Sequence, residues 1–93
     1  MLQKVRVRIF VSGLVQGVFF RSETKNKVEE LGLFGWVGNL ADSRVEILAE
    51  GEKDRLKKLV VWAKKGPDSA KIDGLEIDWQ EYQGEFKNFE IRY

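Results

Sequence analysis

The alternation of apolar and polar residues near the start of the chain predicts a β-strand. In the run VRVRIFV (residues 5–11), every second side chain is aliphatic and two arginines lie between them. A period of two is typical of a strand with one face on a core. We therefore expect an apolar face and an opposite polar face, formed by Val5, Val7, Ile9 and Val11 and by Arg6 and Arg8, respectively.

Two stretches further along have the spacing of amphipathic helices. The segment SETKNKVEELG (22–32) carries an apolar stripe and ends at a glycine, a common helix stop. The segment 52–65 carries a second stripe and is followed by Gly66-Pro67, which ends it. The predicted inward residues are Thr24, Val28 and Leu31 in the first helix and Leu56, Leu59, Val60 and Ala63 in the second.

The remaining apolar runs predict four more strands. FGWVGNL (34–40) and RVEILAEG (44–51), joined around LADS, are expected to form a hairpin. LEIDWQEY (75–82) and FKNFEIRY (86–93) follow, with Gly84 turning the chain and the last strand as part of a hairpin. Their predicted inward residues are Leu75, Ile77, Trp79, Phe89, Ile91 and Tyr93. The tryptophans are expected to pack in the core or at its edge, namely Trp36, Trp62 and Trp79.

The order of these elements predicts the fold class. The order is β-α-β-β-α-β, with the last two strands counted together as a hairpin, and such a chain with a mostly antiparallel sheet packs most economically with both helices on one sheet face. We therefore expect an α+β fold, a ferredoxin-like α/β sandwich. Residues 1–93 are too few for two domains, so one domain is predicted.

Composition limits the classes of function. Sixteen Lys and Arg stand against fifteen Asp and Glu, a net charge of +1, which gives no bulk attraction to nucleic acid or an anionic membrane, so any anion site must be local. The absence of Cys and His excludes disulfides, thiol nucleophiles, histidine bases and the usual zinc ligands. Asp42 and Glu46 lack the partners that a metal site needs, so we expect no metal. No apolar run resembles a signal peptide, and we expect a cytoplasmic protein.

A glycine-framed loop joins the first predicted strand to the first predicted helix. In GLVQGVFFRS (13–22), Gly13 and Gly17 bracket three residues and Arg21 follows. This spacing fits neither the nucleotide P-loop nor the dinucleotide fingerprint. A tight turn can nevertheless direct backbone N–H groups into one concavity at a helix N-terminus, and a guanidinium there matches two oxygens of a phosphate. An anion site and an ordinary turn beside a surface arginine both remain open.

Asn39, at the end of the second predicted strand, is the other candidate residue. Asparagine is common in turns, so it could simply cap the hairpin. In the predicted sandwich the first and third elements lie close together, which would let the end of the second strand face the loop after the first. Asn39 would then present an amide, both donor and acceptor, that can hold a water beside the anion.

These residues resemble the motifs of the acylphosphatase family. Its first motif, Gly-x-Val-Gln-Gly-Val-x-Phe-Arg, is matched from Gly13 to Arg21, and LGLFGWVGN (31–39) matches the second. The resemblance covers nearly the whole chain and implies metal-independent hydrolysis of acyl phosphates, with no cofactor and with inorganic phosphate as product inhibitor. It also implies that Arg21 and the loop bind the phosphoryl group while Asn39 positions the attacking water; we expect a monomer. The loop residues concerned are Val15, Gln16, Gly17, Val18, Phe19 and Phe20.

The chain departs from the family pattern in its hairpin turn. Asp42-Ser43 stands where the family usually has Asp-Gly. Because serine tolerates a left-handed backbone poorly, we expect a turn of another type or one residue wider. In relatives that end at the same tyrosine, the terminal carboxylate is thought to pair with the loop arginine, which implies a pair between Tyr93 and Arg21.

Two other classes of function fit the same order of elements. Domains of this type occur as modules of larger carbamoyl-transfer proteins, where they process carbamoyl phosphate; a free chain of 93 residues counts against that reading. RNA-recognition modules share the element order, and LFGWVGN faintly resembles their aromatic strand. The near-zero net charge and the lack of a basic strip with two exposed aromatics count against RNA binding.

Overall fold

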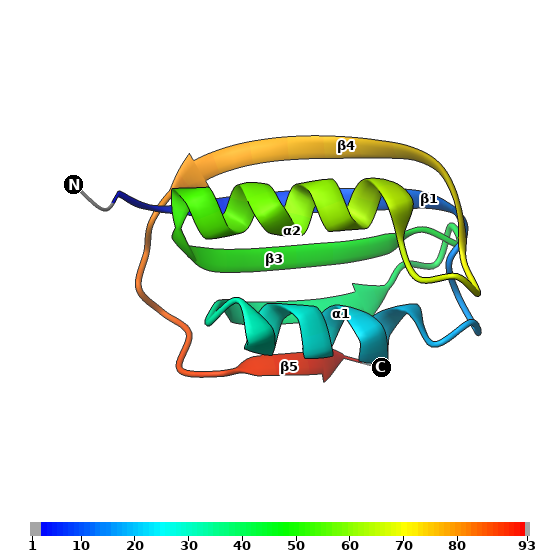
Figure 1. Ribbon diagram of the computed structural model, residues 1–93, viewed down its shortest axis with the longest axis horizontal. Coiled ribbons are helices and arrows are strands. Elements are labelled where there is room, and N and C mark those ends of the chain that lie inside the picture. The colour runs from blue at the N-terminus through cyan, green and yellow to red at the C-terminus, as the bar shows by residue number, and fades with distance from the viewer. Residues whose placement is uncertain (1–2, 93) are drawn as a thin grey trace.

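The computed structural model describes residues 3–92, and its elements follow the predicted order. The elements are β1 (Lys4–Leu14), α1 (Phe20–Glu30), β2 (Phe34–Asn39), β3 (Val45–Glu52), α2 (Lys53–Lys65), β4 (Lys71–Glu81) and β5 (Phe89–Arg92). The strands form one sheet in the order β4-β1-β3-β2-β5, antiparallel except between β2 and β5. Both helices cover the same face of the sheet, which confirms the ferredoxin-like sandwich (Figure 1).

The core lies between that face and the helices. The period-two pattern of β1 is confirmed, since Val7, Ile9 and Val11 have no exposed surface. They pack against the apolar stripe of α2, where Leu56 and Leu59 are equally buried. Removal of apolar surface from water is the main favourable term in folding, so these facing stripes fix how the helices sit on the sheet.

The predicted hairpin of the last two strands is wrong. β4 pairs with β1 at one edge of the sheet, whereas β5 runs parallel to β2 at the other edge. The connection between them, residues 82–88, therefore crosses the end of the sheet that lies far from the C-terminus (Figure 1). The sequence pattern shows which face of β5 is apolar but not which edge it joins, and α1 needs β5 beneath it to bury that face.

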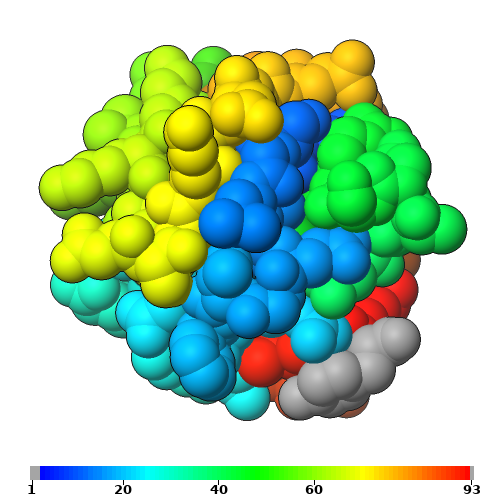
Figure 2. All heavy atoms as spheres, turned by 90° about the vertical axis from the view of Figure 1, so that its right-hand side faces the viewer, coloured from blue at the N-terminus to red at the C-terminus, as the bar shows by residue number. Residues whose placement is uncertain are grey.

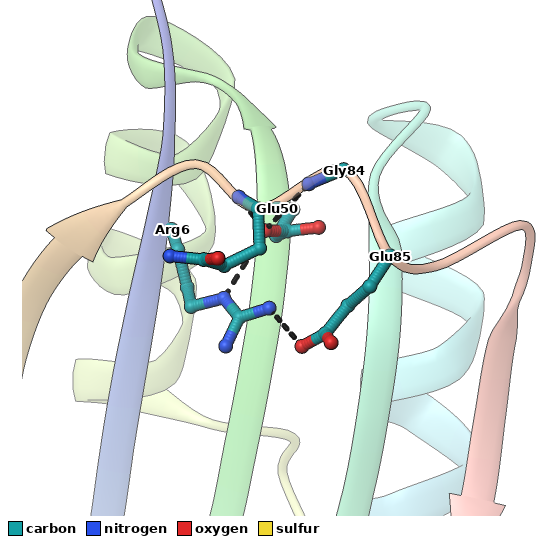
Figure 3. A network of polar contacts seen from close by, with 5 residues as sticks. Arg6, Glu50, Gly84 and Glu85 are labelled. Carbon is teal, nitrogen blue, oxygen red and sulfur yellow. Dashed lines mark hydrogen bonds and ion pairs between the residues drawn. The ribbon is translucent and has the colours of Figure 1, made fainter.

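A buried ion pair holds this crossing connection. Arg6 is on the polar face of β1, as expected, but it is only 8% exposed, and its partner Glu50 of β3 is 1% exposed. The Arg6 Nε donates to Glu50 Oε2 at 3.1 Å, and the Gln83 backbone N–H donates to the same oxygen at 2.7 Å. A second guanidinium nitrogen donates to Glu85 (Figure 3). Burial alone would lower the pKa of Arg6, but the two carboxylates outweigh it and raise that pKa.

Two of the three tryptophans lie outside the core. Trp36 pairs with Leu48 on the sheet face away from the helices, where the guanidinium of Arg92 stacks 4.2 Å from its ring centre. Trp79 is on the helix side but remains 41% exposed. It lies on the edge strand β4 near the first residue of α2, so the helix covers it only in part. Trp62 does pack at the core edge, 5.7 Å from the ring of Phe20.

Candidate functional site

The loop between β1 and α1 depends on its glycines. A Cβ on Gly13 would lie 2.1 Å from the backbone oxygen of Lys71, so only glycine fits beside β4 there. Gly17 has a φ of +71°, in the left-handed region that glycine adopts without strain. Phe19 has a φ of +63° and forms the N-cap of α1 without a side-chain capping bond. Two left-handed residues so close together fold the segment back on itself.

This folding leaves the loop amides available. Within residues 3–92, the backbone N–H groups of Val15 to Phe20 have no protein acceptor. The side chains of Val15 and Phe20 are each 1% exposed and anchor the loop in the core. The side chains of these two predicted substrate-binding residues are therefore not available to a ligand. Unpaired N–H groups at a helix N-terminus favour an anion.

Two side chains fix the loop to its neighbours. Gln16 donates through Nε2 to the carbonyl oxygens of Leu40 and Arg44, both at 2.9 Å. On the other side, the Ser69 hydroxyl donates to the carbonyl of Val18 at 2.6 Å. Figure 2 shows the result: the loop (blue) lies between the β2–β3 connection (green) and the connection after α2 (yellow). The loop is thus held from both sides.

The expected closeness of β1 and β2 is wrong, because β3 lies between them. Both strands run antiparallel to β3, so their C-terminal ends still reach the same end of the sheet. Gln16 spans the gap that β3 creates by reaching the turn that joins β2 to β3. The loop does lie beside the end of β2, as predicted, but through the bonds of Gln16 to this turn and not through pairing of β1 with β2.

Arg21 and Asn39 both lie at this end of the sheet. The Nη1 of Arg21 donates to the carbonyl oxygen of Arg92 at 3.0 Å. Arg92 is the β5 partner of Gly38, the residue before Asn39. Asn39 itself is exposed, and its side-chain amide has no hydrogen-bond partner within residues 3–92. The predicted pair between Arg21 and Tyr93 lies outside the described residues.

The hairpin turn corrects another expectation. Ser43 has a φ of +76°, so it does adopt the left-handed backbone. The Ser43 N–H donates to the Leu40 carbonyl at 3.3 Å, and the Leu40 N–H donates to the Arg44 carbonyl at 2.8 Å. This is a three-residue loop built on a type I turn, the kind that usually places glycine at its last position. The Arg44 backbone N–H and guanidinium stabilise the Asp42 carboxylate and lower its pKa.

Arg21 also lines a shallow pocket with apolar neighbours. The pocket has a volume of about 190 Å³ and is lined by Phe19, Arg21, Ser22 and Ile91. No three acidic side chains come together as a metal site among residues 3–92. In the same range, neither helix has the length and apolar character needed to cross a bilayer.

The sequence did not indicate several of these contacts. Ser69 and the carbonyl of Arg92 come from segments far along the chain, and no local pattern connects either to the loop. Gln16 was predicted as a substrate-binding residue, but both of its donor bonds go to the hairpin. Its side chain therefore positions the loop, and its side-chain N–H groups are not offered to a ligand.

Comparison with known proteins gives a consistent result. The family profile described as Acylphosphatase matches residues 7–91. An acylphosphatase of Pelotomaculum thermopropionicum is 41% identical over 92 residues, which are 99% of this chain and 100% of the relative. The crystal structure of acylphosphatase from Bacillus subtilis has a TM-score of 0.91 and 36% identity, over 96% of this chain and 99% of that one. Full-length HypF, in its phosphate- and nucleotide-bound form, is 28% identical with a TM-score of 0.86, over this whole chain but 12% of its own.

Proposed function

The chain belongs to the acylphosphatase family, and we propose that it hydrolyses acyl phosphates to a carboxylate and inorganic phosphate. One observation carries the proposal: a loop with available amides, Arg21 and the exposed amide of Asn39 gather at one end of the sheet. The loop supplies donors, the guanidinium supplies charge, and the asparagine supplies a neutral polar group. Together these meet the needs of phosphoryl transfer to water.

In the proposed site, the phosphoryl oxygens accept hydrogen bonds from the main chain of Val15 to Phe20 and from Arg21. The guanidinium bonds two oxygens in its plane, which neutralises charge and fixes the orientation of the group. The hydrogen bond from the Arg21 guanidinium to the Arg92 carbonyl supports this role, since it limits the rotamers of the arginine before substrate arrives. Donors that need no rearrangement stabilise the transition state most effectively.

Asn39 positions the attacking water. The amide oxygen can accept a hydrogen bond from the water while the amide N–H₂ group donates one to a phosphoryl oxygen. The two bonds place the water for in-line attack. A substrate phosphoryl oxygen accepts the proton that the water loses, so the site needs no histidine. The P–O bond to the acyl group breaks, and its electron pair leaves with the carboxylate, a weak base that requires no strong general acid.

Turnover of a synthetic acyl phosphate tests the proposal. We expect the purified chain to hydrolyse benzoyl phosphate at the same rate with and without excess chelator, and inorganic phosphate to inhibit competitively. Carbamoyl phosphate belongs in the substrate panel, because the family resemblance also implies domains of this type within larger carbamoyl-transfer proteins. Absence of turnover on every acyl phosphate, or activity that chelator abolishes and a divalent ion restores, would contradict the proposed mechanism.

A further inference from the structure

Phe19 is exposed to an extent that the fold does not require. Its side chain is 78% exposed, more than any other large hydrophobic residue within residues 3–92. It also has a φ of +63°, a region that aromatic residues seldom occupy. A glycine or asparagine would form the same turn with less strain. Packing therefore gives no reason for an aromatic ring at this position.

The residues around Phe19 form a pocket that suits a ligand. Its ring lines the shallow pocket of about 190 Å³ together with Arg21, Ser22 and Ile91. Ile91 comes from β5, one residue before the carbonyl that accepts from Arg21. One cation and two apolar side chains therefore share a single hollow. Such a pocket suits a molecule with an anionic group joined to an apolar body.

An acyl phosphate has that form, since its phosphoryl group carries the charge and its acyl group can be apolar. If Arg21 holds the phosphoryl group, the acyl group attached to it lies within reach of the walls of the same pocket. An acyl group that contains a ring or a short aliphatic chain would then exclude water from the faces of Phe19 and Ile91 that are otherwise exposed to solvent. An acetyl group is too small to cover much of that surface.

We infer that Phe19, with Ile91, binds the acyl group and makes the chain selective for acyl phosphates with an aryl or larger apolar acyl group. This inference rests on the proposed function and names its substrate class. The strained backbone at residue 19 is retained because it turns the ring toward the substrate instead of toward the core. Phe19 determines specificity in this scheme and takes no part in the chemistry.

Comparison of benzoyl phosphate with acetyl phosphate tests the inference in the full chain. The variant Phe19→Ala should lose about threefold to tenfold in kcat/KM for benzoyl phosphate, the loss expected for one partly exposed aromatic contact. For acetyl phosphate, kcat/KM should change less than twofold, and the inhibition constant of inorganic phosphate should stay the same. For each substrate, the kcat/KM of the variant is divided by the kcat/KM of the unmodified chain. This ratio removes the difference in intrinsic reactivity between the two substrates.

Two further variants make the result specific. Phe19→Tyr keeps the ring and should retain the preference for benzoyl phosphate. Phe34→Ala removes a ring that is 44% exposed and lines a different pocket, with Lys4 and Tyr82, so it should leave both substrates unaffected. Equal losses on both substrates in Phe19→Ala, or no loss on either, would overturn the inference while leaving the proposed function intact. If the unmodified chain hydrolyses neither substrate, the proposed function itself is wrong, and the inference with it.

Discussion

Arg21 and Asn39 differ in how the protein holds them. Arg21 is tied to the carbonyl of Arg92 and sits in the first turn of α1. Asn39 ends β2, with its backbone paired to Val45 and its side chain exposed. The arginine therefore suits a binding role that needs a fixed orientation. The asparagine suits contact with a small molecule such as water.

Replacing each of the two residues should separate their roles. Asn39→Ala should lower kcat by roughly 10²-fold or more, because a dipole that positions the nucleophile is lost. Inorganic phosphate should still bind and inhibit, because the loop amides and Arg21 supply most of the bonds to it. Arg21→Lys keeps the charge but loses the bidentate geometry, and should weaken phosphate inhibition and turnover together. Steady-state kinetics with phosphate as inhibitor measure both; if Asn39→Ala weakens phosphate inhibition and spares kcat, the assignments are wrong.

Ser43 carries strain that a smaller residue would release. Its φ of +76° is unfavourable for serine, so Ser43→Gly should raise the free energy of unfolding by up to about 1 kcal/mol or leave it unchanged. Urea denaturation measures this directly. Ala41→Gly is the control, because Ala41 is in the same turn without a positive φ, and it should lower stability slightly. A clear loss of stability in Ser43→Gly would mean that the serine side chain holds the turn together.

At the scale of elements, the connection after β4 determines where β5 lies. Glu50 accepts from the backbone N–H groups of Gln83 and Gly84, at 2.7 and 3.3 Å, and from Arg6. The guanidinium of Arg6 also lies 5.3 Å from the ring centre of Phe86. A connection that would otherwise be free to move is thereby fixed over the sheet (Figure 3). Because β5 supplies the carbonyl that holds Arg21, this network supports the site from the opposite end of the molecule.

Glu50→Gln should therefore destabilise the fold strongly. The substitution leaves the buried guanidinium of Arg6 without its buried countercharge, and we expect a loss of about 2–4 kcal/mol in the free energy of unfolding. Glu85→Gln removes the other carboxylate, whose side chain is 55% exposed, and should cost less than about 1 kcal/mol. Chemical denaturation of both variants gives the comparison. Equal and small losses would show that the buried pair does not hold the connection.

Local patterns in the sequence predicted the elements well, and long-range pairing poorly. The alternation in β1 and the stripe of α2 are dictated by burial on one face, so Ile9 and Leu56 were placed correctly. The edge that β5 joins depends on contacts between distant segments, which no local period records. The loop was likewise predicted to lie near Asn39 because β1 and β2 were expected to be close, but β3 lies between them. Gln16 instead connects the loop to Leu40, the residue after Asn39. The left-handed Ser43 was missed because the hydrogen bonds of the turn override its intrinsic preference.

For the molecule as a whole, charge argues against nucleic-acid binding. The uncovered face of the sheet does carry two aromatic residues, Phe10 and Trp36, both half-buried. Their rings are occupied, however, by the guanidinium groups of Arg44 at 4.9 Å and Arg92 at 4.2 Å. Arg8 on this face is paired with Glu46 at 2.6 Å. Bases could stack on these rings only after displacing the arginines, and the net charge of +1 offers little attraction to phosphates.

We therefore expect no salt-sensitive binding of single-stranded RNA. Fluorescence anisotropy of a labelled oligonucleotide at low ionic strength should remain unchanged as the protein is added. Binding that appears at low salt and weakens steadily as salt is raised would contradict this expectation and favour the RNA-recognition alternative. Trp36→Ala would then show whether the sheet face is responsible.

The most direct test of the account is to locate bound phosphate by NMR. Titration of the nitrogen-15-labelled chain with inorganic phosphate should shift the amide signals of residues 15–20 and the side-chain signals of Arg21, and leave most others in place. A second basic hollow provides the contrast: it has a volume of about 460 Å³, lies between the helices, and is lined by Lys27, Lys57, Lys58, Val61 and Trp62. Saturable shifts confined to the loop and Arg21 are the predicted result. Shifts centred on the lysines of the other hollow, with the loop amides unchanged, would contradict the claim that the loop holds the phosphoryl group.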